Sequence, residues 1–391
     1  MAVSIRDPIH GSIGIDDWAL ALIGHPVFQR LRRVKQLGTA ELVYPGAHHN
    51  RFEHSLGAHY LAGQLAEGLS LDDSDTLTLR AAALLHDVGH GPFSHAFEEI
   101  IKEQGRAHEG TTVDLVRWGP LGDLLRQHGL DPVAVSEAVV GEGSLSSIVS
   151  GALDADRMDY LLRDAHYTGV RCSVDPGRLC RVIERGEEGV LVRESGILAA
   201  EGLLTTRFLM YPAVYYHHTV RASEAILLEA IRTYMQETDV PMEALEQCGD
   251  EELLHRIRSN GGTGASFVKR LDERRLYKRA YEGRELQEGE LDALLKPGAK
   301  MKLRQDIADA AGVDLGHVLL DIPKPPKFRE TNLHVKLRNG DVVPMRDASQ
   351  LVNILHAARM DHWRHWVFAP KKHAEAVGRA AERELGPLAR F

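Results

Sequence analysis

The sequence predicts a mainly α fold, in which an all-helical bundle is followed by a smaller C-terminal α/β lobe. Segments with apolar residues at helical spacing fill most of residues 16–235, and breaks rich in Gly, Pro or Asp separate them. Clear β-type segments gather only beyond residue 316. A length of 391 residues suits one large domain with an accessory lobe. We therefore expect a helical domain at residues 1–235 and an α/β lobe at residues 236–391.

Breaks in the apolar periodicity divide the first part of the chain into separate helices. They are predicted at residues 16–36, 53–70, 76–88, 93–104, 108–117, 132–140, 154–166, 175–184 and about 198–235. Residues 188–194 favour a short strand or hairpin instead, because three β-type residues in a row follow Gly189.

The C-terminal part is expected to mix short helices with strands. Residues 241–311 predict short helices, interrupted by a glycine cluster at residues 260–264. This cluster lacks the Gly-Lys-Ser/Thr ending of a phosphate loop, so we expect a flexible connection there. Strands are predicted at residues 317–321, 332–337, 342–344 and 363–369, with an Asn339-Gly340 hairpin turn.

The composition is typical of a soluble globular protein, with 43% hydrophobic residues, 26% charged residues and a net charge of -9. This mild acidity argues against a dominant nucleic-acid surface. No apolar run approaches the 18 residues that a membrane span needs, so no membrane partner is expected. The three cysteines, Cys172, Cys180 and Cys248, are too few for a disulfide framework. A reducing cytoplasm is the expected location.

Three short segments carry a split set of metal-ligand residues, namely His54, His86 with Asp87, and Asp156. Imidazole with carboxylate suits Fe, Mn, Co or Zn, whereas magnesium alone is expected to use oxygen ligands only. The sequence therefore predicts that these four residues bind one divalent transition-metal ion.

The adjacent His86-Asp87 pair is the informative part of this set. Two neighbours on a regular helix point about a third of a turn apart, but a helix end lets them converge. The apolar run at residues 81–85 favours helix, and residues 88–92 favour a stop and a tight loop. Each residue alone is better explained as a buried histidine or a capping aspartate. Apolar flanks on both sides imply burial, however, and buried charges are paired or coordinate metals.

With these motifs together, the sequence resembles the HD superfamily of phosphohydrolases, and within it the deoxynucleoside triphosphate triphosphohydrolases typified by the sterile-alpha-motif and HD-domain protein. The motifs that carry the resemblance lie at residues 7–11, 28–32, 36–38, 49–55, 86–95, 108–109, 156–160 and 163–164. The family's metal ligands correspond to His54, His86, Asp87 and Asp156, the same four that ligand chemistry indicates.

The resemblance implies metal-dependent hydrolysis of deoxynucleoside triphosphates to deoxynucleoside and inorganic triphosphate. The metal would activate the water that attacks the α-phosphorus, and a second ion, magnesium, would arrive with the triphosphate. His90, His95 and His108 would surround the phosphates. His95 is the expected general acid at the leaving 5′-oxygen, since a histidine can give up a proton at neutral pH.

The resemblance also assigns residues to the substrate. Arg51 and Arg157 would bind the phosphate tail, although Arg157 stands where close relatives use lysine. Asp164 would accept from the 3′-hydroxyl, and Tyr160 would close against the 2′ position. The remaining contacts are expected from Arg207 at the phosphates, Tyr215 near the sugar or base, and Gln36 and Leu37 at the base edge and sugar.

A dimer or larger homo-oligomer is expected by analogy only. Gly24 and His25 stand where family members that are activated by guanine nucleotides place an aspartate, so the GTP-driven tetramer is not expected. Arg32, Arg274 and Lys278 still match basic positions of that effector site.

Two other functions stay open at this point. One is an HD phosphodiesterase or nucleotidase that acts on another nucleotide or phosphate ester. The other is a non-catalytic nucleotide or single-strand nucleic-acid binder, which the basic stretch at residues 269–279 would serve.

Overall fold

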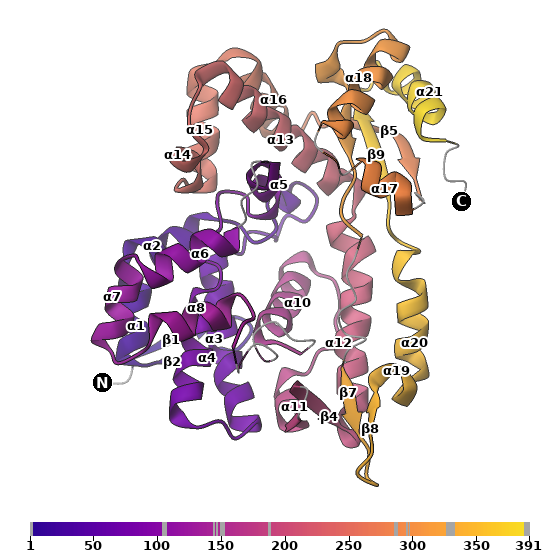
Figure 1. Ribbon diagram of the computed structural model, residues 1–391. Helices are drawn as coiled ribbons and strands as arrows, with labels where there is room; N and C mark the ends of the chain where they lie inside the picture. Colours follow the sequence, from indigo (N-terminus) through magenta and orange to yellow (C-terminus); the bar gives the residue numbers. More distant parts are fainter. Residues whose placement is uncertain are drawn as a thin grey trace.

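The computed structural model describes residues 3–103, 108–143, 145, 148, 153–186, 189–284, 288–294, 296, 298–325 and 333–386. Helices dominate the structure and the sheets are small (Figure 1), so the predicted fold class is confirmed. None of the helices in the described part is both long and apolar enough to cross a lipid bilayer.

The elements follow one another in three groups. The first group is β1 (Val3–Asp7), β2 (Gly11–Ile15), α1 (Asp17–Gly24), α2 (Pro26–Gln29), α3 (Arg51–Gly68), α4 (Asp73–Leu85), α5 (His95–Glu103), α6 (His108–Arg117), α7 (Pro120–Gln127), α8 (Pro132–Val139), α10 (Ala155–Thr168) and α11 (Pro176–Arg181). The second group is β3 (Ile183–Gly186), β4 (Gly189–Arg193), α12 (Ile197–Met210), a π-helical turn (Tyr211–Tyr215) and α13 (His218–Thr238). The third group is α14 (Met242–Glu246), α15 (Asp250–Asn260), α16 (Gly262–Asp272), β5 (Lys278–Gly283), α17 (Glu288–Leu294), α18 (Ala299–Ala311), β6 (Leu319–Asp321), β7 (His334–Lys336), β8 (Val342–Pro344), α19 (Met345–Ala348), α20 (Gln350–Ala357), β9 (His365–Ala369) and α21 (Ala374–Leu385).

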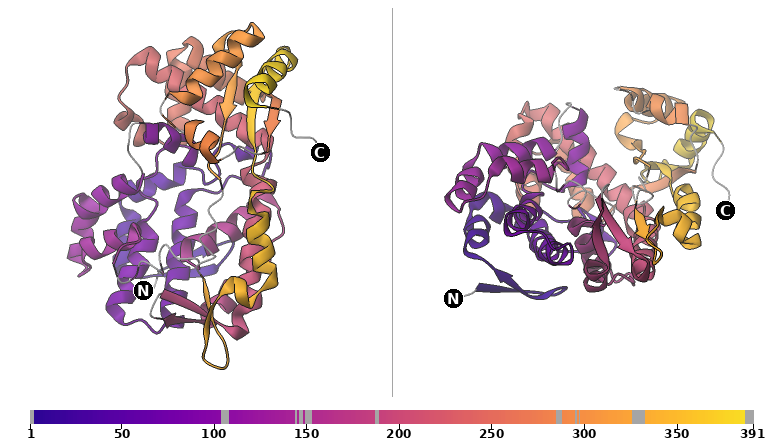
Figure 2. Two further views of the ribbon diagram at one scale, coloured as in Figure 1. Left: turned by 45° about the vertical axis from the view of Figure 1, so that its right-hand side comes forward. Right: turned by 60° about the horizontal axis from the view of Figure 1, so that its bottom comes forward.

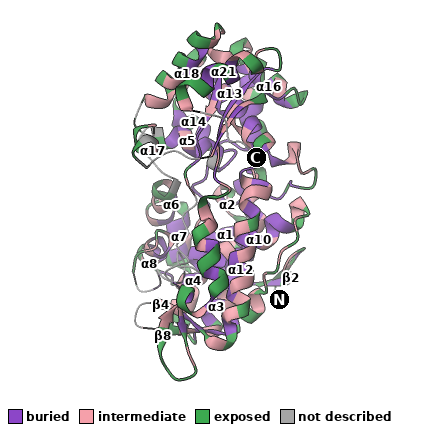
Figure 3. Ribbon diagram, turned by 90° about the vertical axis from the view of Figure 1, so that its right-hand side faces the viewer, coloured by how far each residue is buried: buried purple, intermediate pink, exposed green. Residues whose placement is uncertain are grey.

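Helix α3 is the central helix of the first group. A reciprocal cap starts it, because Asn50 Oδ1 accepts from the Glu53 N–H at 3.2 Å and Asn50 Nδ2 donates to Glu53 Oε1 at 2.9 Å. Buried side chains occur all around it, as expected for a helix enclosed by other helices. It packs against α4 and α10. In Figure 3, buried residues follow the interior and exposed residues lie on outer turns such as those of α18.

The contact between α3 and α10 requires a glycine at position 57. A Cβ atom there would lie 1.8 Å from Asp159 Oδ1 and 2.6 Å from an Arg163 nitrogen, whereas a Cβ on Gly63 would meet nothing closer than 3.6 Å. We therefore expect Gly57→Ala to lower the free energy of unfolding by about 1–3 kcal/mol through overpacking. Gly63→Ala, on the same helix, should raise it by up to about 1 kcal/mol. Urea unfolding of both variants measures this difference, and equal effects would contradict the close approach.

The four-stranded sheet joins distant parts of the chain in the order β3-β4-β7-β8. β3 and β4 form an antiparallel hairpin, and β7 pairs with β4 in parallel with Val335 opposite Val192. Gly340 has a φ of 94° in the turn that leads from β7 to β8, as the Asn-Gly turn predicts. Figure 1 shows this sheet at the opposite end of the molecule from α18 and α21.

The second larger sheet has the order β5-β9-β6, with antiparallel pairing on both sides of β9. α21 packs against β5 and β9, and α13 packs against β5 and β6. All five residues of β9 are buried, including Trp366 and Phe368. Figure 2 shows this sheet together with α18 and α21, and side chains of α5 belong to the same hydrophobic core as Trp366 and Phe368.

Several predicted elements differ from the observed ones. The helix predicted at residues 16–36 ends at Gly24 and restarts at Pro26, because proline favours the first turn of a new helix. The helix predicted at about 198–235 is interrupted by the π-helical turn that contains Pro212. The glycine cluster is a tight junction between α15 and α16 rather than a flexible connection, with Gly261 at a φ of 72°. The division of the chain at residue 235 stays a prediction, although α13 runs through that position.

Candidate metal centre

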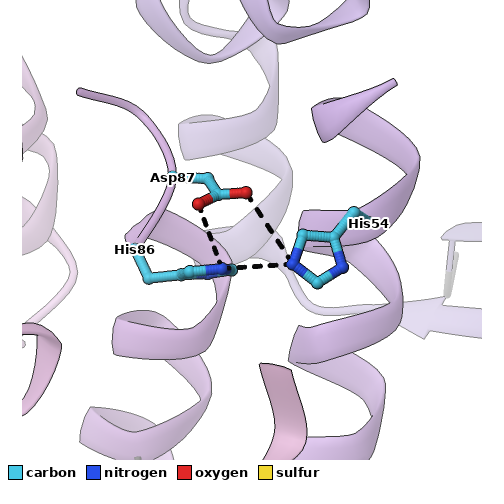
Figure 4. A group of neighbouring side chains, drawn as sticks. All are labelled: His54, His86 and Asp87. Carbon is cyan, nitrogen blue, oxygen red and sulfur yellow. Dashed lines mark hydrogen bonds and ion pairs between the residues drawn. The ribbon is translucent and has the colours of Figure 1, made fainter. Parts of the chain in front are cut away.

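Three separate helices present the four predicted metal ligands. His54 lies in the first turns of α3, and α4 ends at Leu85, so that His86 and Asp87 lie at its C-terminal end. Asp156 lies in the first turn of α10, where the Asp154 side chain caps the helix by accepting from the Arg157 N–H at 2.7 Å. The helix end allows the neighbours His86 and Asp87 to point to one place (Figure 4), as the sequence predicts.

The ligand atoms of His54, His86 and Asp87 all lie within 4.8 Å of one another. The two histidine Nε2 atoms are 3.2 Å apart, and Asp87 approaches His86 Nε2 to 3.3 Å and His54 Nε2 to 3.7 Å. Asp156 Oδ1 lies 3.0 Å from His54 Nε2 and 3.6 Å from His86 Nε2. The structure thus brings all four residues together.

The hydrogen bonds on the far side of each ring leave both Nε2 atoms as ligands. His86 Nδ1 lies 2.8 Å from the Ala83 carbonyl, which can only accept, so Nδ1 carries the proton. His54 Nδ1 lies 2.8 Å from Asp159 Oδ2, a carboxylate oxygen that also accepts. When both rings are neutral, the lone pairs of the two Nε2 atoms therefore face each other and the carboxylates of Asp87 and Asp156. This donor set fits a divalent transition-metal ion.

Without a cation, a proton compensates the charge of this group. Burial lowers the pKa of His54, but its bonds to Asp156 and Asp159 outweigh burial and raise the pKa to about 10. The pKa of His86 is also raised, because nearby Asp87 and Asp156 outweigh burial.

Binding of a divalent cation is therefore expected to release protons at neutral pH, since an imidazole must be unprotonated at the coordinating nitrogen. Between about pH 9 and about pH 7, the apparent affinity for Mn²⁺ should fall about tenfold per pH unit for each proton released. Calorimetric titrations in two buffers with different ionisation enthalpies count these protons. An affinity that is independent of pH in this range would contradict the prediction.

A buried network behind His54 was not predicted from the sequence. Asp159 accepts from His54 Nδ1 at 2.8 Å and lies 2.7 Å from His10 Nε2, and Arg163 binds both of its oxygens at 2.9 Å. Arg163 also donates to Asp7 Oδ2 at 2.9 Å. Burial raises the pKa of Asp159, but Arg163 and the two histidines outweigh burial and hold this pKa well below its usual range. The Asp159-Arg163 spacing of four residues was the only local signal of this network.

Arg51 and His90 also contact the Asp87 carboxylate. Arg51 Nη1 lies 2.5 Å from Asp87 Oδ2, and its Nε donates to Ser94 Oγ at 2.6 Å. His90 Nε2 lies 3.3 Å from Asp87 Oδ1. Burial raises the pKa of Asp87, but Arg51, His86 and His90 together outweigh burial and lower the pKa well below its usual range.

The predicted sugar-facing residues gather two turns further along α10. Asp164 Oδ2 accepts from the Tyr215 hydroxyl at 2.8 Å, and Asp164 Oδ1 lies 2.7 Å from His49 Nε2. Burial and the Asp164 charge raise the pKa of Tyr215 well above its usual range, so its hydroxyl stays a donor. Burial also raises the pKa of Tyr160, and the nearby charges of Arg207 and Arg157 offset only part of this increase.

Individual contacts place three more of the predicted residues, Arg157, Gln36 and Leu37. Arg157 Nη1 is 3.6 Å from Asp154 Oδ2. The backbone N–H of Gln36 donates to the His49 carbonyl at 3.0 Å, and Leu37 packs against the same hydrophobic cluster as Tyr160 and Tyr215. His95 begins α5 and His108 begins α6, but the side chains of both residues lie outside the described part of the structure.

Known protein families match this chain over most of its length. The HD domain model matches residues 51–163, which hold His54, His86, Asp87 and Arg51, and the HD-associated region matches residues 174–387. This chain belongs to the HD-domain family of phosphohydrolases. HD domains bind divalent metal ions, which agrees with the donor set described above.

Relatives of this HD-domain chain include both uncharacterized and named proteins. An uncharacterized protein from Methanocaldococcus jannaschii is 34% identical over 381 residues, covering 94% of this chain and 79% of that protein. The deoxynucleoside triphosphate triphosphohydrolase SAMHD1 from Bos taurus is 30% identical over 339 residues, covering 70% of this chain and 58% of that protein. The chain thus spans less than two thirds of the bovine relative.

A solved structure has a similar fold. The crystal structure of a phosphohydrolase from Bacteroides thetaiotaomicron superposes with a TM-score of 0.77 at 26% sequence identity, covering 94% of this chain and 100% of that chain.

A cavity of about 360 Å³ lies between the start of α13 and β5, away from the four metal ligands. Arg274 and Lys278, two of the basic positions singled out above, line it together with His218 and Arg279. Arg32 is not among its lining residues, because its guanidinium lies 3.5 Å above the Phe52 ring.

Proposed function

We propose that this protein is a cytoplasmic enzyme that hydrolyses deoxynucleoside triphosphates to deoxynucleoside and inorganic triphosphate. The observation that carries the proposal is the arrangement on α10. Asp156 in the metal group, Tyr160, and Asp164 in the Tyr215 group recur every four residues, so they share one face over about 12 Å. A metal centre and a hydroxyl-accepting carboxylate on one face suit a substrate with a phosphate chain at one end and a sugar at the other.

The chain's residues divide the proposed reaction between them. His54, His86, Asp87 and Asp156 would hold a transition metal, and a bound divalent ion lowers the pKa of water and stabilises charge on phosphate oxygens. Arg51, Arg157 and Arg207 supply positive charge for the phosphate tail, to which a magnesium ion would add. The water oxygen bonds to the α-phosphorus and the water gives up a proton to solvent, while the bond from phosphorus to O5′ breaks and O5′ takes a proton. We assign that proton to His95, with His90 and His108 beside the phosphates.

The deoxyribose preference follows from Tyr160 and Asp164. Asp164 would accept from the 3′-hydroxyl while Tyr160 closes the space at the 2′ position, with Gln36 and Leu37 along the base edge and sugar. Shape alone gives only limited discrimination against a substrate with one additional hydroxyl, so ribonucleotides are expected to be slower substrates.

A substrate panel tests this function. The purified protein is incubated with the four dNTPs and the four NTPs in the presence of Mn²⁺, Fe²⁺, Co²⁺, Zn²⁺ or Mg²⁺, and the products are separated. Deoxynucleoside together with inorganic triphosphate is the expected result, and Asp87→Ala provides the inactive control. Monophosphate products, or hydrolysis of phosphodiesters alone, would favour another phosphate-ester hydrolase of the same superfamily. Light scattering on the same material tests the dimer or larger homo-oligomer that is expected by analogy.

A further inference from the structure

His49 begins the motif at residues 49–55, but neither the metal-ligand set nor the proposed reaction gives it a role. It lies just before α3, and only 1% of its surface is exposed. Its ring Nε2 lies 2.7 Å from Asp164 Oδ1, while the Tyr215 hydroxyl donates to Asp164 Oδ2 at 2.8 Å. Since both oxygens of a carboxylate accept, His49 and Tyr215 hold Asp164 from two different segments of the chain.

The backbone of His49 joins a third segment to the same group. Its carbonyl accepts from the Gln36 N–H at 3.0 Å, and Lys35 pairs with Asn50 in an isolated antiparallel bridge. One residue thus connects the Gln36 segment, helix α10 and, through Asp164, the π-helical turn at Tyr215.

The imidazole ring itself is held in one orientation. It stacks on the Tyr167 ring, with 4.7 Å between centroids and an angle of 9°, and the Tyr167 hydroxyl donates to Glu53 Oε2 at 2.9 Å. Within the described part of the chain, the buried His49 Nδ1 has no hydrogen-bond partner. A phenylalanine would stack equally well without burying that nitrogen. The bond from Nε2 to Asp164 is therefore the contribution that requires a histidine.

We propose that His49 is a positioning residue that sets the selectivity of the site for a sugar 3′-hydroxyl, by fixing the orientation of the Asp164 carboxylate. An ionised carboxylate has about four acceptor positions, and His49 and Tyr215 occupy two. The other two positions are then oriented for a substrate hydroxyl. This inference rests on the proposed function, which places Asp164 at the sugar.

Comparing substrates with and without the 3′-hydroxyl tests the inference. The values of kcat/KM are measured for a dNTP and for the matching 2′,3′-dideoxynucleoside triphosphate. His49→Phe keeps the stacked ring but removes the donor, so it should reduce the preference for the dNTP at least about tenfold. The loss should fall on the dNTP, with less than about a threefold change on the dideoxy substrate. His49→Gln retains a donor at similar reach and should restore part of the preference.

Three comparisons separate positioning from damage to the fold. His48→Phe, at the exposed neighbouring position, should leave the preference unchanged. In an Asp164→Ala background, His49→Phe should have no further effect on the preference, because the two residues act as one unit. Tyr215→Phe removes the other donor at nearly constant volume and should also reduce the preference.

Each outcome separates the two proposals. Equal losses of His49→Phe on both substrates, or the full effect of His49→Phe in the Asp164→Ala background, would overturn the role of His49 and leave the proposed function standing. If the unaltered protein hydrolysed neither nucleotide, the proposed function would fail, and the role of His49 with it.

Discussion

Replacing Asp87 by alanine is expected to abolish both metal binding and phosphohydrolase turnover. Asp87 is buried between the two histidine Nε2 atoms and the Arg51 guanidinium, so its removal takes one carboxylate from the donor set. It also leaves the positive charge of Arg51 without its partner at 2.5 Å, beside a site that binds a cation. Both changes act against a divalent ion. His86→Ala should have the same outcome, because it removes a ligand nitrogen.

The expected loss in kcat/KM is at least about 10³-fold, which is the order seen when a principal catalytic group is removed. Metal content measured by plasma emission spectroscopy should fall to background in the same samples. Asp73→Ala is a suitable control, because Asp73 is exposed in the first turn of the helix that ends before His86. Full activity of either ligand variant would contradict the proposed metal centre.

Arg163→Met should produce the largest loss of stability among single substitutions of charged residues in this region. The Arg163 side chain is fully buried and binds both oxygens of Asp159 and one of Asp7, and these carboxylates are 0% and 4% exposed. Removing the guanidinium takes the positive partner away from two buried carboxylates, and this should lower the free energy of unfolding by about 3–5 kcal/mol. Because Asp159 accepts from His54, affinity for Mn²⁺ should also fall by about 10- to 100-fold.

Denaturant unfolding together with a metal titration measures both effects. Arg379→Met breaks an ion pair with Glu375 in which the two side chains are 63% and 86% exposed. That control should change the free energy of unfolding by less than about 0.5 kcal/mol. A similar, small effect of Arg163→Met would show that the buried network contributes little.

Local chemistry in the sequence explains why part of the site was predictable. His86 and Asp87 follow a helix-forming apolar run and precede Gly89, so the helix end that makes them converge is encoded within ten residues. Asp156, Tyr160 and Asp164 share a helix face through their spacing alone. The family resemblance pointed to the same residues, and the structure brings His86, Asp87 and Asp156 together while Asp164 contacts Tyr215 two turns along α10.

Residues that act through distant partners could not be predicted in this way. His10 reaches Asp159 across 149 positions and His49 reaches Asp164 across 115, and no local pattern encodes such a pairing. β2 was missed because Gly11 and Gly14 weaken the strand signal that apolar alternation would otherwise give, and β1, which pairs with β2 in a two-stranded sheet, was missed with it. β5 was missed for a similar reason, because its charged residues hide a strand that the burial of Tyr281 stabilises.

The parallel pairing of β7 with β4 limits how this protein can be shortened. A recombinant fragment that stops after α13 would retain His54, His86, Asp87 and Asp156, yet it would lose the strand that covers Val192. Val192, which is fully enclosed in the intact chain, would then lie on an open strand edge. Such a fragment is expected to aggregate on expression, so a shortened protein for enzymology has to keep β7.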